Sequence, residues 1–494
     1  MIESYLPLLA VSVGALAILP ILLSARRPNL REFWTIAAAF IKFSVVMIIL
    51  LHSQSGEVLQ STLIEIVPGI SIVLRADTFG LYFAIIASGL WIFTSFYSIG
   101  YVRGAGEKHQ TRYFASFALC LSATLGIAFA GNIFTFLLFY ELLTLATYPL
   151  VVHKETPKAI AAGRKYLSYT LVAGLMLVVA TGLVYYYTGT VDFRAGGILK
   201  GAGLSVAVIV TIFLLFLGAV GVKAGLMPIH SWLPAAMAAP TPVSSLLHAV
   251  AVVKSGVFGV IRVVGFIFGP EVMEQFALNQ ILMVIAGTTV IVASLLAFQQ
   301  DNLKRRLAYS TVGHLSYIVL GASLLTQLGM QGAIMHIAAH ATMKITLFFS
   351  AGAIYVNLHR ENISQLDGIA KVMPWTMGAF TVGALGLAGV PPINGFLSKW
   401  FLALGSLQGD TLVPMLILVI SGLLNLGYFY PIVRRAYFGD PEGLEGYGEA
   451  SPFMVVPIVS AAALSLIFGI FPNAFFGFFD MAQSVAVQLM GGTP

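Results

Sequence analysis

Long apolar segments follow one another along the whole chain and constrain its fold more than any other feature. Of the 494 residues, 59% are hydrophobic and 9% are charged, against about 25% charged residues in a typical soluble chain. We therefore expect an all-α polytopic membrane protein rather than a water-soluble globule. The 26 Lys+Arg and 20 Asp+Glu form no clustered basic face, which excludes nucleic acid as a partner.

Hydropathy predicts fourteen membrane-spanning helices joined by short loops, in a single membrane domain over residues 1–494. The expected spans are 5–24, 33–52, 78–101, 113–130, 132–151, 166–188, 204–229, 242–267, 277–299, 307–325, 330–357, 374–406, 411–433 and 453–478. Residues 57–76 alternate β-branched side chains around Pro68 and Gly69, which predicts a hairpin.

Basic residues gather in alternate loops. Odd-numbered loops hold 17 Lys and Arg, whereas even-numbered loops hold three: Arg75, Arg194 and Lys200. Because Lys and Arg accumulate in cytoplasmic loops, this asymmetry favours an even number of spans. It also predicts that both termini lie on the outer side of a bacterial or archaeal cell membrane.

A small set of ionisable residues falls inside the expected spans. They are Lys42, Lys223, Lys254, Arg262, Lys344, Lys399, Glu141, His248, His314, His336 and His340. A charge at the bilayer centre costs about 2.5 to 3.5 kcal/mol, so these groups must face one another or water. We expect Glu141 to pair with Lys223 and keep it protonated; a purely structural ion pair is the alternative. Arg262 is expected to extend toward the headgroups, and Lys42 has no motif around it.

Prolines interrupt two of the expected spans. Pro228 follows Lys223, and Pro391 and Pro392 precede Lys399. Proline removes a helical hydrogen bond, and a bilayer tolerates the freed backbone groups only where they meet protein or water. Two broken helices beside lysines therefore indicate an ion site, with a simple helix end and Pro-rich loop as the alternative.

The two interruptions resemble each other. GLMPIHSWL, starting at Gly225, aligns with GVPPINGFL, starting at Gly389, and four of the nine positions are identical. They lie five spans apart, and an odd offset inverts the second copy across the membrane. We therefore expect two inverted five-helix repeats, 113–267 and 277–433, each with one broken helix.

Histidines and a lysine share one face of the span 330–357. His336, His340 and Lys344 recur every fourth residue, which favours a water-linked proton wire that His314 extends. The sequence HIAAH lacks the glutamate of the zinc motif HExxH, so we expect no metal. The single cysteine, Cys120, excludes disulfides and iron–sulfur ligation, and we expect no cofactor.

Together, Glu141, MPIHSWLP after Lys223, APTPVSSLLHA, HxxxHxxxK and GVPPINGFLSK resemble the proton-conducting antiporter-like family. That family comprises pumping subunits of respiratory complex I, of energy-converting hydrogenases and of Mrp sodium/proton antiporters. The resemblance extends from about the third span to the thirteenth, and it implies fourteen helices in two inverted repeats. The proton-translocating residues that it implies are Glu141, Lys223, Lys254, His248, His336, His340, Lys344 and Lys399.

The resemblance implies a proton-translocating subunit of a multi-subunit membrane complex, without catalytic chemistry of its own. Other membrane subunits are the expected partners, and protons, with sodium ions as an open alternative, are the cargo. Because no long lateral helix follows the last span, a subunit like the D-type subunit of Mrp antiporters, or a hydrogenase membrane-arm subunit, is favoured. A proton-pumping subunit of NADH-quinone oxidoreductase is the alternative.

Three other classes of function make different demands on the chain. A redox enzyme would need a cofactor fingerprint, which the sequence lacks. An organic-solute carrier would need a substrate cavity and would transport its substrate alone. A structural remnant would tolerate replacement of every buried charge.

Overall fold

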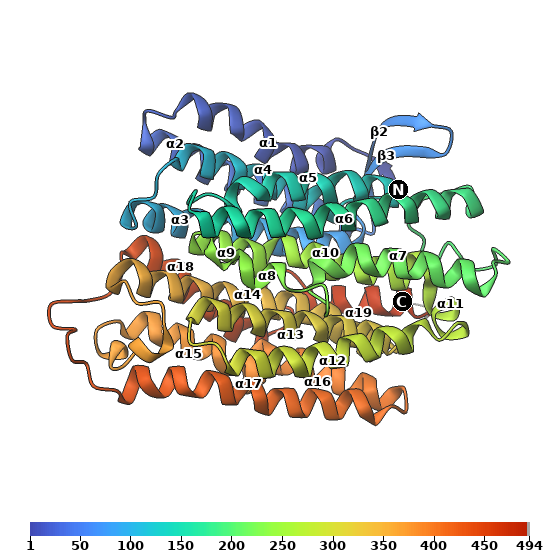
Figure 1. Ribbon diagram of the computed structural model, residues 1–494. Helices are drawn as coiled ribbons and strands as arrows, with labels where there is room; N and C mark the ends of the chain where they lie inside the picture. Colours follow the sequence, from blue (N-terminus) through green and yellow to red (C-terminus); the bar gives the residue numbers. More distant parts are fainter. Residues whose placement is uncertain (492–494) are drawn as a thin grey trace.

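The helices lie side by side in one bundle, as Figure 1 shows. The computed structural model describes residues 1–491. Its first helices are α1 Leu6–Leu23, α2 Pro28–Gln54, α3 Thr78–Gly104, α4 Gln110–Ala128, α5 Ile133–Val151, α6 Pro157–Thr188, α7 Val206–Ala224, α8 Trp232–Ala235, α9 Thr241–Ser245, α10 Val252–Arg262 and α11 Gly269–Gln275. The others are α12 Leu278–Phe298, α13 Leu303–Ser323, α14 Gln327–Leu358, α15 Pro374–Ala388, α16 Asn394–Gln408, α17 Leu412–Phe438, α18 Pro452–Ile470 and α19 Phe478–Leu489.

The expected helical membrane fold is confirmed. Within residues 1–491, twelve helical segments are long and apolar enough to cross a membrane, with 241–275 taken as one. Neither α13 nor the pair α15 and α16 is among these twelve: α13 carries more polar residues, and α15 and α16 are each too short. The count of fourteen crossings stays a prediction.

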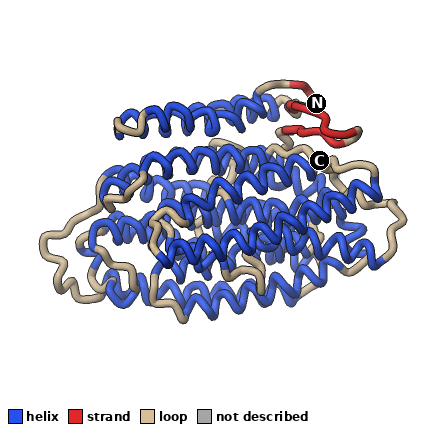
Figure 2. Tube along the Cα trace, turned by 45° about the horizontal axis from the view of Figure 1, so that its top comes forward, coloured by secondary structure: helices blue, strands red, loops and turns tan. Residues whose placement is uncertain are grey.

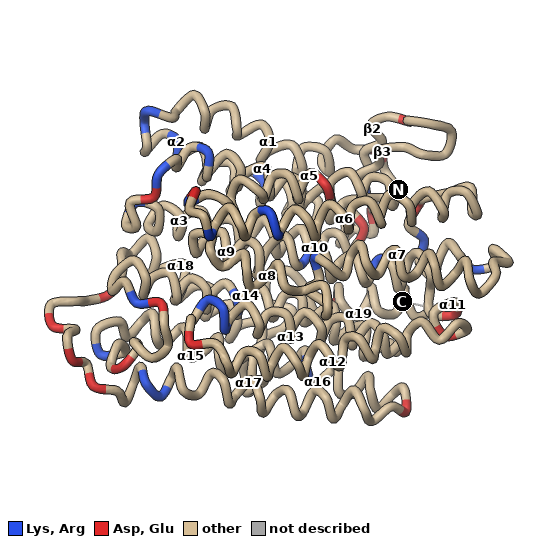
Figure 3. Tube along the Cα trace, in the orientation of Figure 1, with Lys and Arg blue, Asp and Glu red and all other residues tan. Residues whose placement is uncertain are grey.

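Most Lys and Arg residues of the loops lie at one end of the bundle (Figure 3). We call it the basic end; it holds the loops 24–27, 105–109, 152–156 and 299–302 and the acidic loop 439–451. The N-terminus and the strands lie at the opposite end (Figure 1). The charge asymmetry of the sequence therefore corresponds to a polarity of the folded bundle.

The predicted hairpin is confirmed. The strands β2 Leu59–Val67 and β3 Ile70–Arg75 pair antiparallel around Pro68 and Gly69. Gly69 has a φ of 81°, which glycine adopts without steric cost. The short strand β1 Ile2–Glu3 adds in parallel to β2, and Figure 2 shows all three strands beside the N-terminus, apart from the helices.

The span that begins with α7 is broken. Helix α7 ends at Ala224, followed by Gly225 with a φ of 70°, and helical structure resumes only at Trp232. The peptide bond before Pro228 is cis. The indole Nε1 of Trp232 donates to the Val222 carbonyl over 2.8 Å, so the segment after the break folds back against the end of α7.

The span formed by α15 and α16 is broken in the same way. Helix α15 ends at Ala388, and Gly389 has a φ of 96°. The peptide bond before Pro392 is cis, and α16 begins at Asn394, whose Nδ2 donates to Thr342 Oγ1 over 3.1 Å. The division into inverted repeats, 113–267 and 277–433, stays a prediction.

The expected span 242–267 is not one regular α-helix. The π-helical segments Leu246–Val250 and Val263–Phe268 lie on either side of α10. Residues 239–269 are buried throughout, as are residues 329–354 of α14. Short π segments often occur at functional sites, and this stretch carries His248 and Lys254.

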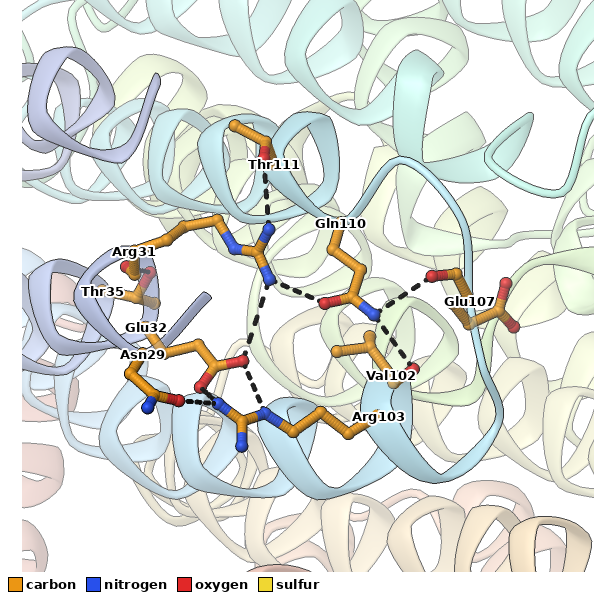
Figure 4. Close-up of polar contacts among 9 residues, drawn as sticks. All are labelled: Asn29, Arg31, Glu32, Thr35, Val102, Arg103, Glu107, Gln110 and Thr111. Carbon is orange, nitrogen blue, oxygen red and sulfur yellow. Dashed lines mark hydrogen bonds and ion pairs between the residues drawn. The ribbon is translucent and has the colours of Figure 1, made fainter. Parts of the chain in front are cut away.

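A polar clamp joins α2, α3 and α4 at the basic end (Figure 4). Glu32 is buried and binds the guanidinium of Arg103, whose Nε donates to Oε1 over 2.9 Å. Arg31 Nη2 donates to Gln110 Oε1 over 2.6 Å and Nη1 to Thr111 over 3.2 Å. Glu32 thus pairs with both guanidinium groups, Arg103 directly and Arg31 over 3.8 Å, and ties the basic ends of the three helices together.

Arg262 does not extend toward the headgroups, so that expectation is wrong. Its side chain is only 1% exposed, and its two Nη atoms donate to Asp77 over 2.6 and 2.9 Å. The guanidinium lies within 5.4 Å of the ring centroids of Phe79, Phe193, Phe258 and Phe266. A carboxylate at the start of α3 satisfies the charge inside the protein, so the side chain need not reach water.

We expect Asp77→Asn to lower the free energy of unfolding by about 3 kcal/mol, because it leaves the buried Arg262 charge unpaired. Asparagine keeps the cap on α3, where Asp77 Oδ1 accepts from Gly80 N over 2.7 Å. Denaturant unfolding in detergent, followed by circular dichroism, measures the change.

The matched control is Glu271→Gln, which breaks the pair with Lys200. Both of those side chains are more than half exposed, so the loss should stay below about 1 kcal/mol. Equal losses in the two variants would contradict the role assigned to Asp77.

Candidate functional site

Lys223 lies in the last turn of α7 and reaches α5. Its Nζ donates to the Tyr140 carbonyl over 2.6 Å and lies 3.4 Å from the centroid of the Tyr140 ring. Lys223 has no exposed surface. A carbonyl oxygen and an aromatic face both stabilise an ammonium group, so this lysine is satisfied without a carboxylate.

Glu141 is next to Tyr140 on α5, but its carboxylate lies against α6. A Cβ on Gly174 would lie 2.5 Å from Glu141 Oε1, so the glycine leaves the space that the carboxylate occupies. The expected ion pair with Lys223 is not formed: the lysine Nζ donates to the Tyr140 carbonyl, and the carboxylate lies on the side of α6. Among residues 1–491, Glu141 Oε1 has no hydrogen-bond partner.

Lys254, on α10, lies between the end of α7 and helix α14. A Cβ on Gly256 would lie 2.1 Å from the Ala224 nitrogen, so α10 packs directly against the end of α7 that carries Lys223. Lys254 Nζ lies 2.7 Å from Nδ1 of His340 on α14, and both side chains are fully buried. This contact is the first link of a polar line that runs along α14.

The line continues through three histidines. The ring of His314, on α13, lies 5.7 Å from the ring of His340 and 5.4 Å from that of His336, centroid to centroid. His314 Nδ1 and His336 Nε2 are 3.2 Å apart, and His336 Nδ1 lies 2.8 Å from Ser398 Oγ on α16. Helix α14 therefore joins Lys254 to the second broken span.

Neighbouring groups determine where the ring protons lie. Asn425 Nδ2 donates to His314 Nε2 over 3.2 Å, so His314 carries its proton on Nδ1 and donates it to His336. His336 then carries its own proton on Nδ1 and donates to Ser398. The N–H groups of both histidines therefore point along the line toward Ser398.

Lys399 is the residue after Ser398 and lies at the second break. It belongs to α16, but its Nζ donates back to the Leu387 and Ala388 carbonyls at the end of α15, over 2.6 and 3.2 Å. Its Nζ also lies 4.9 Å from the centroid of the Tyr317 ring. The carbonyl end of a helix carries partial negative charge, so this position suits a cation.

Lys344 starts a second polar line on the same face of α14. Its Nζ donates to Ser310 Oγ over 2.7 Å and to the Leu307 carbonyl over 3.1 Å. Tyr428 OH lies 2.7 Å from both Ser310 Oγ and Asn425 Oδ1. The Asn425 oxygen can only accept, so Tyr428 donates to it, and Ser310 must donate to Tyr428.

Two of the residues singled out in the sequence lie apart from these lines. His248 is fully buried with its ring 4.8 Å from that of Phe348, and neither ring nitrogen has a partner among residues 1–491. Lys42, on α2, is also fully buried; its Nζ has no hydrogen bond to any described residue and lies 5.4 Å from the centroid of the Trp91 ring.

Sequence reasoning missed Tyr140, Ser398, Asn425 and Tyr428. Asn425 and Tyr428 are three residues apart in an apolar segment and therefore lie on one helix face. An asparagine in a membrane helix is a detectable signal, because its amide needs partners there. Tyr140 acts through its carbonyl oxygen, which no side-chain pattern reveals.

Comparisons with known proteins identify the family and the fold of the chain. Residues 130–425 match the family described as NADH:quinone oxidoreductase/Mrp antiporter, TM. NADH-quinone oxidoreductase subunit N from Desulforudis audaxviator is 32% identical, over 71% of each chain. The D-type subunit of the Na(+)/H(+) antiporter from Alkalihalophilus pseudofirmus is 29% identical, over 85% of this chain and 84% of the relative. A chain of the membrane-bound sulfane sulfur reductase, an archaeal respiratory membrane complex, has the same fold, with a TM-score of 0.88, 23% identity and 99% of each chain covered.

We expect the proton on Nδ1 in His314 and His336, and on Nε2 in His340, because Lys254 donates to His340 Nδ1. Nitrogen-15 NMR of histidine-labelled protein at neutral pH distinguishes the two tautomers. Asn425→Leu removes the donor that orients His314, so its signal should become a mixture of tautomers. The signal of His340 should not change, and an Nε2 proton on His314 in the unmodified protein would refute the assignment.

Proposed function

Because the chain belongs to the NADH:quinone oxidoreductase/Mrp antiporter family, we propose that it conducts protons across a membrane as one subunit of a larger complex. The observation that carries the proposal is the buried line from Lys254 through His340, His314 and His336 to Ser398, the residue before the partly buried Lys399 on α16. Burying this many ionisable groups is costly, and proton transfer is the activity that requires them together.

We propose that protons pass from Lys223 to Lys254 and then along the histidines to Lys399. The close packing of α7 against α10 at Gly256 supports the first step. The buried Nε2 of His340 has no partner among residues 1–491 and is a site that an ordered water molecule would satisfy on the way to His314. The carbonyl end of α15 receives the charge at Lys399.

Glu141, His248 and Lys344 take different parts in this proposal. The Glu141 carboxylate, free of an ion pair, can approach Lys223 or withdraw from it, and its charge then favours or disfavours a proton on the lysine. His248, in the π-helical segment Leu246–Val250, is proposed to act from beside the line of histidines, because its ring packs against Phe348 on α14. Lys344 supplies a fixed branch through Ser310.

Other membrane subunits are partners of the relatives' complexes, and two exposed breaks support the same for this chain. Pro228, Pro391 and Pro392 are exposed on the single chain. Irregular backbone is not tolerated against lipid, so a neighbouring subunit is the expected cover for each break.

We propose a role like that of the D-type subunit of Mrp antiporters, or a membrane-arm role in an energy-converting hydrogenase. A proton-pumping subunit of NADH-quinone oxidoreductase is the second candidate, which the relative from Desulforudis audaxviator favours. The basic end is proposed to face the cytoplasm, in accord with the positive-inside rule, which places the N-terminus on the outer side.

We expect Lys254→Met to slow proton transport about a hundredfold, the contribution of one positioned proton-transfer group. The assay uses the assembled complex in vesicles, with a pH-sensitive dye inside. Lys42→Met is the matched control: it also removes a fully buried lysine, but one outside the line, and should leave the rate within about twofold. Equal rates in the two variants would refute the proposed route.

Sodium separates the two modes of coupling. For an antiporter, an inward sodium gradient imposed on the vesicles should drive protons the opposite way without any electron donor. For a redox-driven subunit, proton uptake should follow addition of donor and should not depend on sodium.

Glu141→Gln should slow proton movement about tenfold or more in either mode, because it removes the charge next to Lys223.

A further inference from the structure

A basic cavity opens at the basic end of the bundle, and no residue of the polar lines described above is part of its lining. It has a volume of about 510 Å³. One wall comes from α6 and the loop before it, another from the first turns of α13, and the floor from segment 231–238, which follows the break in α7. The cavity therefore joins the two halves of the chain.

The charged side chains that line the cavity are almost all positive. They are Lys154, Lys158, Lys165, Lys304, Arg305 and Glu361. Five cations against one carboxylate give a net charge of +4 at this site. A concave surface with one sign of charge concentrates counter-ions in its mouth.

Most of these cations lack an internal counter-ion. Lys154 contacts Glu107 over 3.7 Å, and Lys304 donates to the Ala239 carbonyl over 2.7 Å. Within residues 1–491, the side chains of Lys158, Lys165 and Arg305 form neither an ion pair nor a hydrogen bond. Three donors of this kind, facing one cavity, are available to an anion from outside.

Two long helices add to the positive potential. Helix α6 begins at Pro157 after its cap Thr156, and α13 begins at Leu303 after its cap Asn302; both caps line the cavity. A helix N-terminus carries partial positive charge and unpaired N–H groups. Both helix ends therefore act in the same direction as the side chains.

We propose that this cavity binds a phosphate group, carried by an anionic phospholipid headgroup or free in solution. Lysines supply point charges, and the Arg305 guanidinium supplies the planar donor pair that suits phosphate oxygens. The cavity is lined by the first turns of α6 and α13 at the basic end of the bundle, where a phosphate group from solution or from a lipid headgroup can enter. A bound phosphate bridges α6 and α13 next to the α7 break.

The test compares binding to the full chain, purified in detergent and stripped of lipid. The probes are mixed micelles of phosphatidylglycerol, mixed micelles of phosphatidylcholine, and inorganic phosphate. The cavity variant combines Lys158→Gln, Lys165→Gln and Arg305→Gln. Each basic residue near a lipid surface contributes about 1 kcal/mol, so this variant should bind phosphatidylglycerol about a hundredfold more weakly.

The matched control combines Lys108→Gln, Lys371→Gln and Arg434→Gln. It removes the same charge from exposed positions at the same end of the bundle, outside the cavity. The control should bind phosphatidylglycerol as the parental protein does. Glu361→Gln removes the cavity's carboxylate and should raise the affinity about fivefold, which tests the site even if the triple variant misfolds.

The probes identify the source of the phosphate group. Binding of phosphatidylglycerol that inorganic phosphate does not displace supports a lipid ligand. Binding of inorganic phosphate that displaces the lipid supports a free anion at the same site. Equal affinities for phosphatidylglycerol and phosphatidylcholine, equal losses in the two triple variants, or an unchanged affinity in Glu361→Gln would each overturn the proposal.

Discussion

The whole structure depends on one constraint: positively charged side chains inside an apolar bundle must have polar partners in the protein rather than contact lipid. Four lysines and Arg262 meet this constraint in different ways. Lys223, Lys344 and Lys399 donate to backbone carbonyls, and Lys254 contacts a histidine. Arg262 is instead paired with a carboxylate. A lysine amine keeps N–H donors whether or not it is charged, so a carbonyl satisfies it in both states. The lysine sites can therefore lose and regain a proton, whereas guanidinium–carboxylate pairs stay charged and serve the fold.

The helix breaks place two lysines in equivalent surroundings although their sequence positions do not match. Lys223 comes before its break and Lys399 after its own, so an alignment of the two segments separates them. In the structure, Lys223 lies on the last turn of the first half-helix, and Lys399 folds back onto the last carbonyls of the other first half-helix. Both cations thus lie at the negative end of a helix that stops inside the apolar region.

Sequence patterns within one segment correctly predicted the features that depend on that segment alone. Apolar runs predicted the helices, alternation around Pro68 predicted the hairpin, and the spacing of His336 and His340 predicted a shared face. Tertiary packing decided the rest. The prediction that Arg262 extends toward water failed because its partner, Asp77, is 185 residues away in the chain and no local pattern reveals it. The ion pair of Glu141 with Lys223 depended on which side of α5 had room, and Gly174 on α6 provides that room for the carboxylate. Asn425 enters the site through the packing of α17, which no spacing within one helix specifies.

The chemistry of Asn425 limits what the two polar lines can do. Its amide donates to His314 and accepts from Tyr428, so it touches both lines. An amide neither gains nor loses a proton near neutral pH, so a proton that reaches Tyr428 from Lys344 cannot continue through Asn425. The same amide occupies His314 Nε2, which leaves Nδ1 as the atom through which His314 passes its proton to His336. His314 can therefore accept a further proton from the side of His340 only when this amide leaves Nε2, and Tyr428, which donates to the Asn425 oxygen, holds the amide in its present position.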